Sequence, residues 1–448
     1  MKERVETFTY ADGSIQRVQA VTLPGFAEAG FFFPAPSDAA FARIVRLYRS
    51  YAVPRAPYIF DQMVLFRLPG DVPASLPGPA ETERYGALSG PLMRAAAVLR
   101  RGVRVLYGRP VFLNADARAL WEFLVGRGCL EVVSGLLPTT SVLPVSDRLG
   151  LLSQCEPQAA LKANLSFFTM DKFDVCSVYD AIGTPIGLRV RDGQIQSPPL
   201  FEREALLAMR SGEVRIEKPA LTSLGVRIRG TEYRHGENAV FYTRPACRRT
   251  PRHAGTDIVI LENRVAARHT GGGTAVPGAG FVLSTGRADA MPGDPVSFAG
   301  MEDVLFGVQV GNSAVINGVS AAGFTSPFYN IKRPFGPPYP PSLYPTDFKN
   351  ARAPRMALGV DKHGTPLLVW AEGPGKLGFQ KGVDSRGASL AEMGRLCLSV
   401  GMVTGVNLDG GGSAQILLGN RRSLLISDRN PDNTESERAV PVGLIVRG

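Results

Sequence analysis

The stretch Gly405-Val-Asn-Leu-Asp-Gly-Gly-Gly-Ser-Ala-Gln-Ile-Leu-Leu418 decides how this chain is interpreted. A short apolar run delivers Asn407 and Asp409 to three consecutive glycines, and Ser413 opens a second apolar run. Three glycines in a row cost conformational entropy, so they indicate a turn with positive φ or a backbone that another group approaches closely. A carboxylate, glycine amides and a hydroxyl this close together form a candidate site for an oxyanion or a sugar.

Three further elements accompany this turn. They are Asn164-Leu-Ser-Phe-Phe168, Arg355-Met-Ala-Leu-Gly-Val360 and Glu437-Arg-Ala-Val-Pro441. Together with residues 407–413, they resemble in composition and order the motifs of the phosphodiester glycosidase domain family. The resemblance is strong over about residues 350–448 and looser from about residue 155 to residue 350, and nothing before about residue 150 takes part in it. The chain has Ser166 where the family usually has glycine, and Val442 where it usually has asparagine.

The resemblance implies a hydrolase that cleaves a sugar phosphodiester or a related glycosidic bond. Asp409 is the first candidate for the catalytic carboxylate, and Glu437 is the second, because most glycoside hydrolysis needs a pair of acids. Arg355 and Arg438 are candidates for a forked grip on phosphate oxygens, which suits guanidinium geometry. The other substrate-binding candidates are the amides and hydroxyl of the turn and two asparagines that would orient sugar hydroxyls or the carboxylates: Gly410, Gly411, Gly412, Ser413, Asn164 and Asn407.

Each candidate also has a structural interpretation. An aspartate before glycines commonly serves only to form a turn, and Glu437 beside Arg438 is also typical of a surface ion pair. Two rival functions follow. One is a non-catalytic module on the same fold that binds carbohydrate or takes part in envelope or polysaccharide assembly. The other is a nucleic-acid-associated protein that uses its basic surface, in which case binding would fall steeply with salt.

Bulk properties limit the partners. The net charge of +10 comes mostly from scattered arginines, with local clusters at residues 100–104 and 248–252, and no nucleic-acid motif accompanies them. General solubility therefore explains the charge better than nucleic acid, and the expected partner is a carbohydrate or sugar phosphate. The five cysteines form no Cys-x-x-Cys pair, so neither a zinc site nor a disulfide scaffold is indicated. No cofactor is predicted with certainty, although a single calcium or magnesium ion near Asp409 stays open.

The location and oligomeric state are less constrained. No apolar run approaches the roughly 18 residues that a membrane span needs. Because no apolar segment follows Met1 to Thr7, we expect no signal peptide and a cytoplasmic protein, although members of the family are commonly exported. The sequence does not indicate the oligomeric state.

The fold expected is α+β. Residues 1–150 are predicted to form a small α/β accessory domain, including a helix from Asn114 to Leu124, and residues 151–448 a mixed-sheet catalytic domain with flanking helices. Short helices are predicted at residues 203–209 and 389–401, the second with Ser389 and Glu392 as a capping box. The glycine turn is expected at a sheet edge. Residues 324–348 interleave prolines with aromatic residues, which predicts either a substrate-facing loop or a spacer.

Overall fold

The computed structural model describes most of the chain outside the segment 34–148. The described residues are 1–33, 149–169, 179, 183–201, 203–244, 246–286, 289–321, 352–374, 379–430 and 433–447, with the short pieces 64–65, 103–106, 109–112, 114–126 and 131–132. The predicted aromatic and proline-rich segment 324–348 lies outside these residues.

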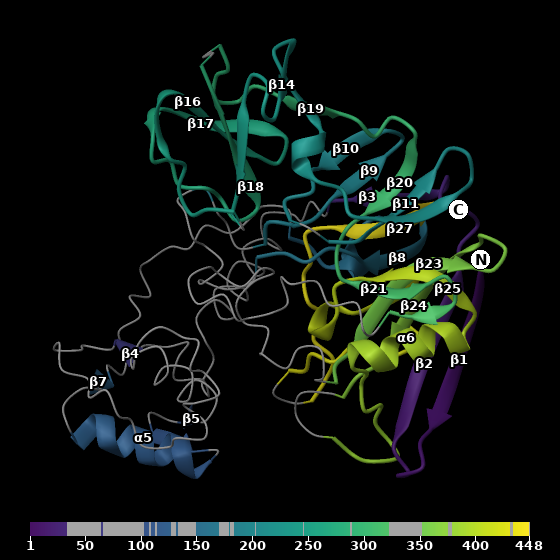
Figure 1. Ribbon diagram of the computed structural model, residues 1–448. Helices are drawn as coiled ribbons and strands as arrows, with labels where there is room; N and C mark the ends of the chain where they lie inside the picture. The colour runs from purple at the N-terminus through teal and green to yellow at the C-terminus, as the bar shows by residue number, and fades with distance from the viewer. Residues whose placement is uncertain are drawn as a thin grey trace.

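The largest sheet in the described residues has seven antiparallel strands and lies at the lower right of Figure 1. Helix α6 (Leu390–Ser399) packs on one face of this sheet, and a cluster of buried apolar side chains fills the space between them. The predicted capping box is confirmed, because the Ser389 side chain accepts the Glu392 amide and the Glu392 side chain accepts the Ser389 amide. The strands, in spatial order, are β1 (Lys2–Thr9), β2 (Ile15–Thr22), β24 (Pro366–Ala371), β23 (Arg355–Asp361), β25 (Met402–Asn407), β21 (Ser313–Ile316) and β22 (Val319–Ser320).

Two smaller sheets cover the other face of the large sheet. The core between these layers contains Leu358 and Trp370 from the large sheet, Leu161 and Phe306 from the smaller ones, and all four are fully buried. One small sheet has the order β26 (Ile416–Leu418), β8 (Ala159–Asn164), β27 (Gly443–Arg447) and β3 (Ala29–Phe32). The other has the order β10 (Gln194–Ser197), β9 (Arg189–Arg191), β20 (Val304–Val308), β11 (Ala205–Met209) and β12 (Val214–Glu217).

The prediction of a helix at residues 203–209 is wrong. These residues contain strand β11, which pairs with β12 on one side and β20 on the other. The run Ala205 to Ala208 is buried at every position, so it carries neither the alternation of a half-exposed strand nor a helical stripe. Periodicity alone does not separate a short, fully buried strand from a helix.

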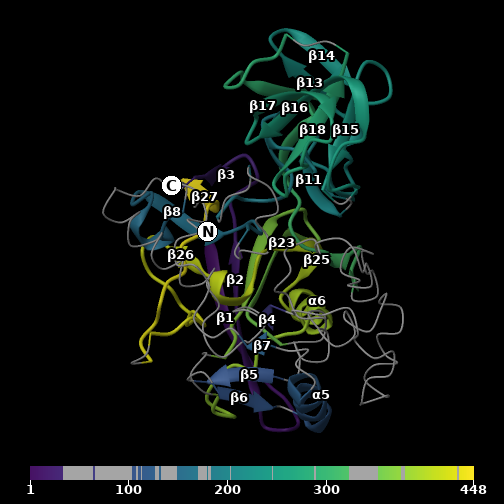
Figure 2. The ribbon, with the colours of Figure 1, turned by 90° about the vertical axis from the view of Figure 1, so that its left-hand side faces the viewer.

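An additional β unit is inserted between β12 and β20. Figure 2 shows it above the main body of the molecule. Its core is continuous with the β9–β11 region, since Ile258 and Phe281 of this unit belong to one buried cluster with Val190 and Leu207. The unit holds a sheet of β14 (Thr231–Arg234), β13 (Gly225–Ile228) and β19 (Val296–Ala299), and a second of β15 (Val240–Thr243), β18 (Gly280–Thr285), β16 (Arg252–Leu261) and β17 (Arg264–Gly272).

The N-terminal strands revise the predicted domain boundary. Strand β2 pairs with β24, with Val18 opposite Ala371, and β3 pairs with β27, with Phe32 opposite Gly443. Residues 2–32 are therefore part of the sheets that also contain residues 355–447, rather than of a separate unit that ends near residue 150. The sheet-centred character of the domain is as predicted.

Only short pieces of the rest of the N-terminal region are described. Strand β4 (Val64–Leu65) pairs with β7 (Glu131–Val132), and β5 (Val103–Leu106) pairs with β6 (Arg109–Phe112). Helix α5 (Ala115–Gly126) matches the helix predicted from Asn114, whose side chain accepts the Ala117 amide. No helix in the described ranges has both the length and the apolar character that crossing a bilayer would require.

Candidate active site

The glycine turn lies where the chain passes from one sheet layer to the other. Strand β25 is internal to the large sheet, and after Asn407 the chain leaves it to form β26 in the four-stranded sheet. The Leu408 amide donates to the carbonyl of Met356 (2.8 Å), and the Asp409 amide donates to the carbonyl of Leu165 (3.0 Å). The turn is therefore held between two layers. It begins at the end of β25, which is internal to the large sheet, and leads into β26, which is an edge strand of the four-stranded sheet, so the predicted edge position holds for the second strand only.

Asp409 is almost completely buried in this crossing. Asp409 is only 2% exposed, and its Oδ1 accepts a hydrogen bond from the Gly410 amide at 3.0 Å. Asp409 Oδ2 and Ser413 Oγ are buried and make no hydrogen bond of normal geometry within the described residues. Burial raises the pKa of Asp409 to about 7, against the opposing influence of the nearby Ser413 hydroxyl, Arg438, the Gly410 amide and Arg355. Near neutral pH this carboxyl can both hold and release a proton.

The glycine amides are less available than the sequence suggests. The Gly410 amide is used by Asp409, and the Gly411 amide donates to the carbonyl of Pro354 at 2.9 Å. Two of the three amides predicted to receive an oxyanion are therefore already engaged, one within the turn and one with Pro354. Gly411 has a φ of +61°, and a Cβ added there would meet no heavy atom within 4 Å, so its side faces open space.

Arg438 forms a buried ion pair that the sequence did not predict. Its Nε and Nη2 donate to Oδ2 of Asp428 at 2.9 and 2.7 Å, and both residues are nearly inaccessible to water. Gly412 lies directly against this pair, since an added Cβ would be 2.2 Å from Arg438 Nη2 and 2.3 Å from Asp428 Oδ1. Asp428 thus fixes the arginine that acts on Asp409. A sequence signal for it existed, because Asp428 follows the apolar run Leu424–Ile426 much as Asp409 follows β25.

Asn164 connects the two ends of the turn. Its Nδ2 donates to the Asp409 carbonyl at 2.8 Å, and its Oδ1 accepts the Gln415 amide at 3.0 Å. Both groups of the Asn164 side-chain amide are therefore hydrogen-bonded to backbone. In this conformation Asn164 holds the two ends of the turn together and does not present its amide to a sugar.

Asn407 and Arg355 also contact backbone. Asn407 Nδ2 donates to the Asn312 carbonyl at 3.0 Å, while its buried Oδ1 has no hydrogen-bond partner in the described residues. Arg355 Nε donates to the Ala388 carbonyl at 3.0 Å, and the residue is buried. Gly410 lies over the start of β23, with an added Cβ 3.6 Å from the Cα of Arg355. Arg355 therefore lies under the turn, and its positive charge favours the ionised form of Asp409.

Glu437 has a different set of neighbours from Asp409. Its Oε1 accepts the Ser153 amide at 3.0 Å, and its Oε2 is 3.6 Å from Arg422 Nη1. In the parts of the chain that are described, no hydrogen bond or ion pair joins Glu437 to Asp409 or to the glycine turn. The predicted carboxylate pair thus consists of one residue inside the turn and one beside Arg422.

The surroundings of Asp409 are positively charged. Arg438 and Arg355 both act on its carboxylate, and their positive charges repel a metal cation. Over the described ranges, no three His, Cys, Asp or Glu side chains are grouped as a metal site. A calcium or magnesium ion at Asp409 stays a prediction.

Comparison with known proteins identifies the class of domain. The family model of the phosphodiester glycosidases matches residues 259–447, so the C-terminal part of the chain is similar to that domain. Human N-acetylglucosamine-1-phosphodiester alpha-N-acetylglucosaminidase is 35% identical over 86 residues, which is 19% of this chain and 15% of that protein. The resemblance carried by the motifs at residues 407–413 and 437–441 is thereby confirmed, while the match spans only a small part of the human relative.

Three solved structures align over nearly the whole chain at low similarity. A hypothetical protein from Synechocystis aligns with a TM-score of 0.42 and 15% identity, covering 99% of this chain and 61% of that one. A putative exported protein from Burkholderia pseudomallei gives 0.42 and 16%, covering 100% and 97%. The catalytic domain of the zebrafish N-acetylglucosamine-1-phosphodiester alpha-N-acetylglucosaminidase, auto-inhibited by its pro-peptide, gives 0.38 and 10%, covering 100% and 82%.

Proposed function

We propose that this protein is a hydrolase of sugar phosphodiesters in which Asp409 is the catalytic acid or base. The observation that carries the proposal is the state of that carboxyl. It is buried, one of its oxygens makes no hydrogen bond of normal geometry within the described residues, and its pKa is raised to about 7. A general acid or base works best when its pKa lies near the working pH, and enzymes reach that condition by burying a carboxyl.

The proposed chemistry is water attack at the anomeric carbon. Asp409 Oδ2 takes a proton from the water as its oxygen bonds to the sugar carbon, and the bond from that carbon to the phosphate oxygen breaks. The phosphate monoester leaves with the bonding electrons and needs little protonation, because it is already a good leaving group. Arg438 and Arg355, both close enough to influence Asp409, stabilise the negative charge of the departing phosphate.

Glu437 is proposed as the second carboxylate because glycoside hydrolysis generally uses two acids. Its Oε1 accepts the Ser153 amide and its Oε2 lies 3.6 Å from Arg422 Nη1. A carboxylate at this place would serve to stabilise positive charge at the sugar. A purely structural Glu437 would instead hold Arg422, which also bonds Gln415 Oε1 at 3.2 Å, in place.

The test is hydrolysis of a panel of sugar phosphodiesters and aryl glycosides, each with and without EDTA. The wild type is compared with Asp409→Asn, Glu437→Gln and the matched control Asp303→Asn, which changes an exposed turn carboxylate. We expect Asp409→Asn to lose at least about 100-fold in kcat, the usual contribution of general acid–base catalysis, and the control to keep full activity. Folding of each variant is checked by circular dichroism.

The outcomes separate the rival functions. Loss of turnover in folded Asp409→Asn, with Asp303→Asn active, supports the proposal, and loss in Glu437→Gln as well extends it to both acids. A wild type that is inert on the whole panel but binds its sugars would favour the carbohydrate-binding module. Retention on a heparin column that weakens steeply with salt, without turnover, would favour the nucleic-acid alternative.

A further inference from the structure

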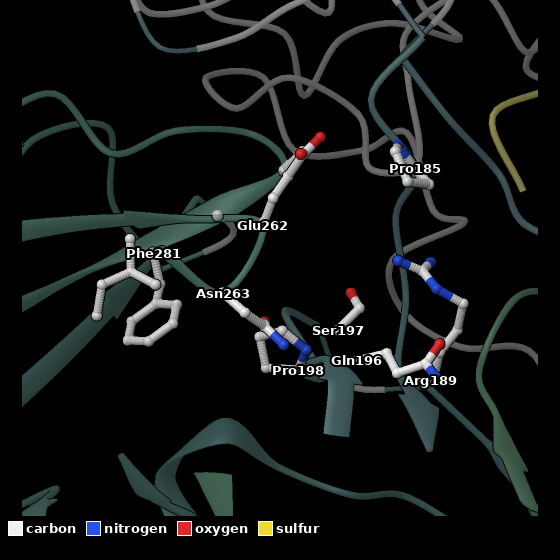
Figure 3. Close-up of a pocket in the computed structure, with 11 residues that line it drawn as sticks. Pro185, Arg189, Gln196, Ser197, Pro198, Glu262, Asn263 and Phe281 are labelled. Atoms are coloured by element: carbon white, nitrogen blue, oxygen red, sulfur yellow. The ribbon is translucent and has the colours of Figure 1, made fainter. Parts of the chain in front are cut away.

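A small pocket lies between β9–β10 and the turn that joins β16 to β17 (Figure 3). Gln196 and Asn263 line it, and the buried Oε1 of Gln196 and Oδ1 of Asn263 make no hydrogen bond within the described residues. The pocket has room for about one or two water molecules, which commonly satisfy such atoms. It is therefore too small for an organic ligand, and a larger partner would bind elsewhere.

Strand β1 is the longest regular edge of the described sheets. It ends the seven-stranded sheet and pairs with β2 at eight consecutive positions without a bulge. Its other side pairs with no strand in the described part of the chain. Figure 1 shows it in purple at the right-hand margin. An unpaired edge of this kind presents a row of N–H and C=O groups to which a further strand can bind.

The other edge strands of the described sheets are short or irregular. All but one have two to four residues, and the exception, β17, pairs with β16 in a register that is interrupted at two places. Short edges, bulges, proline and charged side chains are the usual protections against pairing with another chain. Of these, β1 has only charged side chains.

The charged side chains of β1 complement a second copy of the same strand. An antiparallel pairing of two copies about an axis at Val5 places Arg4 opposite Glu6 of the second copy, and Glu6 opposite its Arg4. Moving the axis by one residue would place Arg4 opposite Arg4, or Glu6 opposite Glu6. Moving it by half a residue would place Glu3 opposite Glu6 or form no charge pair. Opposite charges directly across a strand pair stabilise the pairing, and like charges destabilise it.

Arg4 and Glu6 can make these contacts while keeping those that they have. They lie on the face of the sheet that helix α6 covers, because Arg4 Nη2 donates to the carbonyl of Val400 at the end of that helix at 2.6 Å. Arg4 Nε lies 3.2 Å from Glu6 Oε1. Arg4 Nη1 and Glu6 Oε2 have no partner among the described residues, and the Arg4 side chain is 50% exposed.

The opposite face of this edge carries exposed apolar side chains. Val5 is 46% exposed and lies on the same face as Glu3, because side chains alternate along a strand. The segment that leads to Leu425 packs on this face, since Ser423 Oγ donates to Glu3 Oε1, and Leu425 is 51% exposed. In the register centred on Val5, each Val5 would lie beside its counterpart, which would remove apolar surface from water.

We propose that β1 is a homodimer interface in which two copies pair antiparallel about Val5. The two seven-stranded sheets would then join into one sheet of fourteen strands, with an Arg4–Glu6 pair on each side of the axis. Because each copy contributes a single strand, the contact lies at the small end of specific interfaces, and the dimer should dissociate on dilution. It would form whether or not the protein is a hydrolase.

The first experiment is sedimentation velocity over a wide range of concentrations on the wild type, Arg4→Glu, Glu6→Arg and the double variant. Either single change places like charges across the axis, and the double change restores opposite charges. We expect the dissociation constant of the dimer to rise about tenfold or more in each single variant, because two cross-strand pairs change sign at once, and to return to within about threefold in the double variant. Added salt should narrow these differences. Circular dichroism checks that each variant folds.

A second experiment tests the register. Val5→Cys places two thiols on the axis, where Cα atoms of facing residues are about 4.5–5.5 Å apart, so mild oxidation should link the two chains. Thr7→Cys is the matched control, because Thr7 is exposed on the same face, whereas its counterpart would lie roughly 14 Å away along the strand. Mass spectrometry of the linked peptides distinguishes this disulfide from any that the five native cysteines form.

Three results would overturn the proposal. A wild type that is monomeric at every concentration would leave the edge to a partner other than a second copy. Single variants that dimerise as well as the wild type would place the dimer contact on another surface. A Thr7→Cys protein that cross-links as readily as Val5→Cys would exclude the register centred on Val5.

Discussion

Replacing Gly412 by alanine tests whether the glycine turn is shaped by the ion pair beneath it. Gly412 does not have positive φ, so alanine carries no backbone cost there. Its Cβ would, however, be 2.2 Å from Arg438 Nη2 and 2.3 and 2.4 Å from the two Asp428 carboxylate oxygens. These contacts are more than an ångström too short, and the ion pair must move or separate.

The neighbouring Gly411 provides the internal control. It has a φ of +61° but open space around a Cβ, so alanine there meets only the backbone cost, which is about 1 kcal/mol. Overpacking a closely packed site costs about 1–3 kcal/mol, and separating a buried ion pair about 3–5 kcal/mol. We therefore expect Gly412→Ala to lower the free energy of unfolding by about 2–4 kcal/mol. This range lies between the cost of shifting the Arg438–Asp428 ion pair and the cost of breaking it.

Urea unfolding followed by tryptophan fluorescence measures the difference, because Trp370 is fully buried in the core that the turn adjoins. The reasoning is refuted if Gly411→Ala destabilises as much as Gly412→Ala, or if Gly412→Ala is neutral. Either result would mean that Gly412 is not pressed against Arg438 and Asp428 in solution. The same two variants should rank in the same order in any hydrolase assay.

Three further perturbations follow from the structure. The pKa of Asp409, about 7, lies above its ordinary value of 3.8, so the native state holds that proton more tightly and loses stability as pH rises from the lower value to the higher one. Asp409→Asn should therefore gain stability relative to the wild type as pH rises from about 4 to about 7, with little further change above that. A difference in urea midpoint that does not change with pH over this window would contradict the prediction. Asp428→Asn should destabilise the protein by about 3–5 kcal/mol, because it leaves the buried Arg438 without its carboxylate. The freed positive charge of Arg438 should also lower the pKa of Asp409, as read by carboxyl carbon NMR. An unchanged pKa would show that Arg438 does not act on Asp409. Deleting residues 1–33 should abolish soluble expression, since it exposes the paired edges of β24 and β27; a soluble, cooperatively unfolding product would show that these strands are dispensable.

Local signals in the sequence identified the parts of the fold that depend on neighbouring residues. The capping box at Ser389 and Glu392 and the turn after Asn407 are written within a few residues, and both are found where they were predicted. The pairing of β2 with β24 is not local, because Val18 lies opposite Ala371. No feature of residues 1–33 alone indicates which distant strand they join, so the boundary near residue 150 was drawn in the wrong place.

The same distinction applies to the site. Asp409 stands out in the sequence because a carboxylate precedes three glycines, whereas Asp428 has only the weaker signal of a preceding apolar run. Its importance arises only when folding brings it within 2.7 Å of Arg438 and against Gly412. Conversely, Asn164 was recognisable from its motif, but its two bonds to the ends of the turn could not be read from its spacing.

The charges around Asp409 bear on the choice between a phosphodiester and a neutral glycoside. Asp428 already neutralises Arg438, so the region around Asp409 is close to balanced when its carboxylate is ionised. A bound phosphodiester adds a negative charge beside that carboxylate, and a like charge raises the pKa of an acid. For a phosphodiester, ionisation of Asp409 should therefore occur at higher pH in the complex than in the free protein. Because kcat reports the complex and kcat/KM the free enzyme, the acidic limb of kcat should lie above that of kcat/KM for phosphodiesters and coincide with it for aryl glycosides. Coincident limbs for both substrates would mean that the phosphate binds away from Asp409. A group other than Arg438 would then have to be assigned as the one that receives the phosphate.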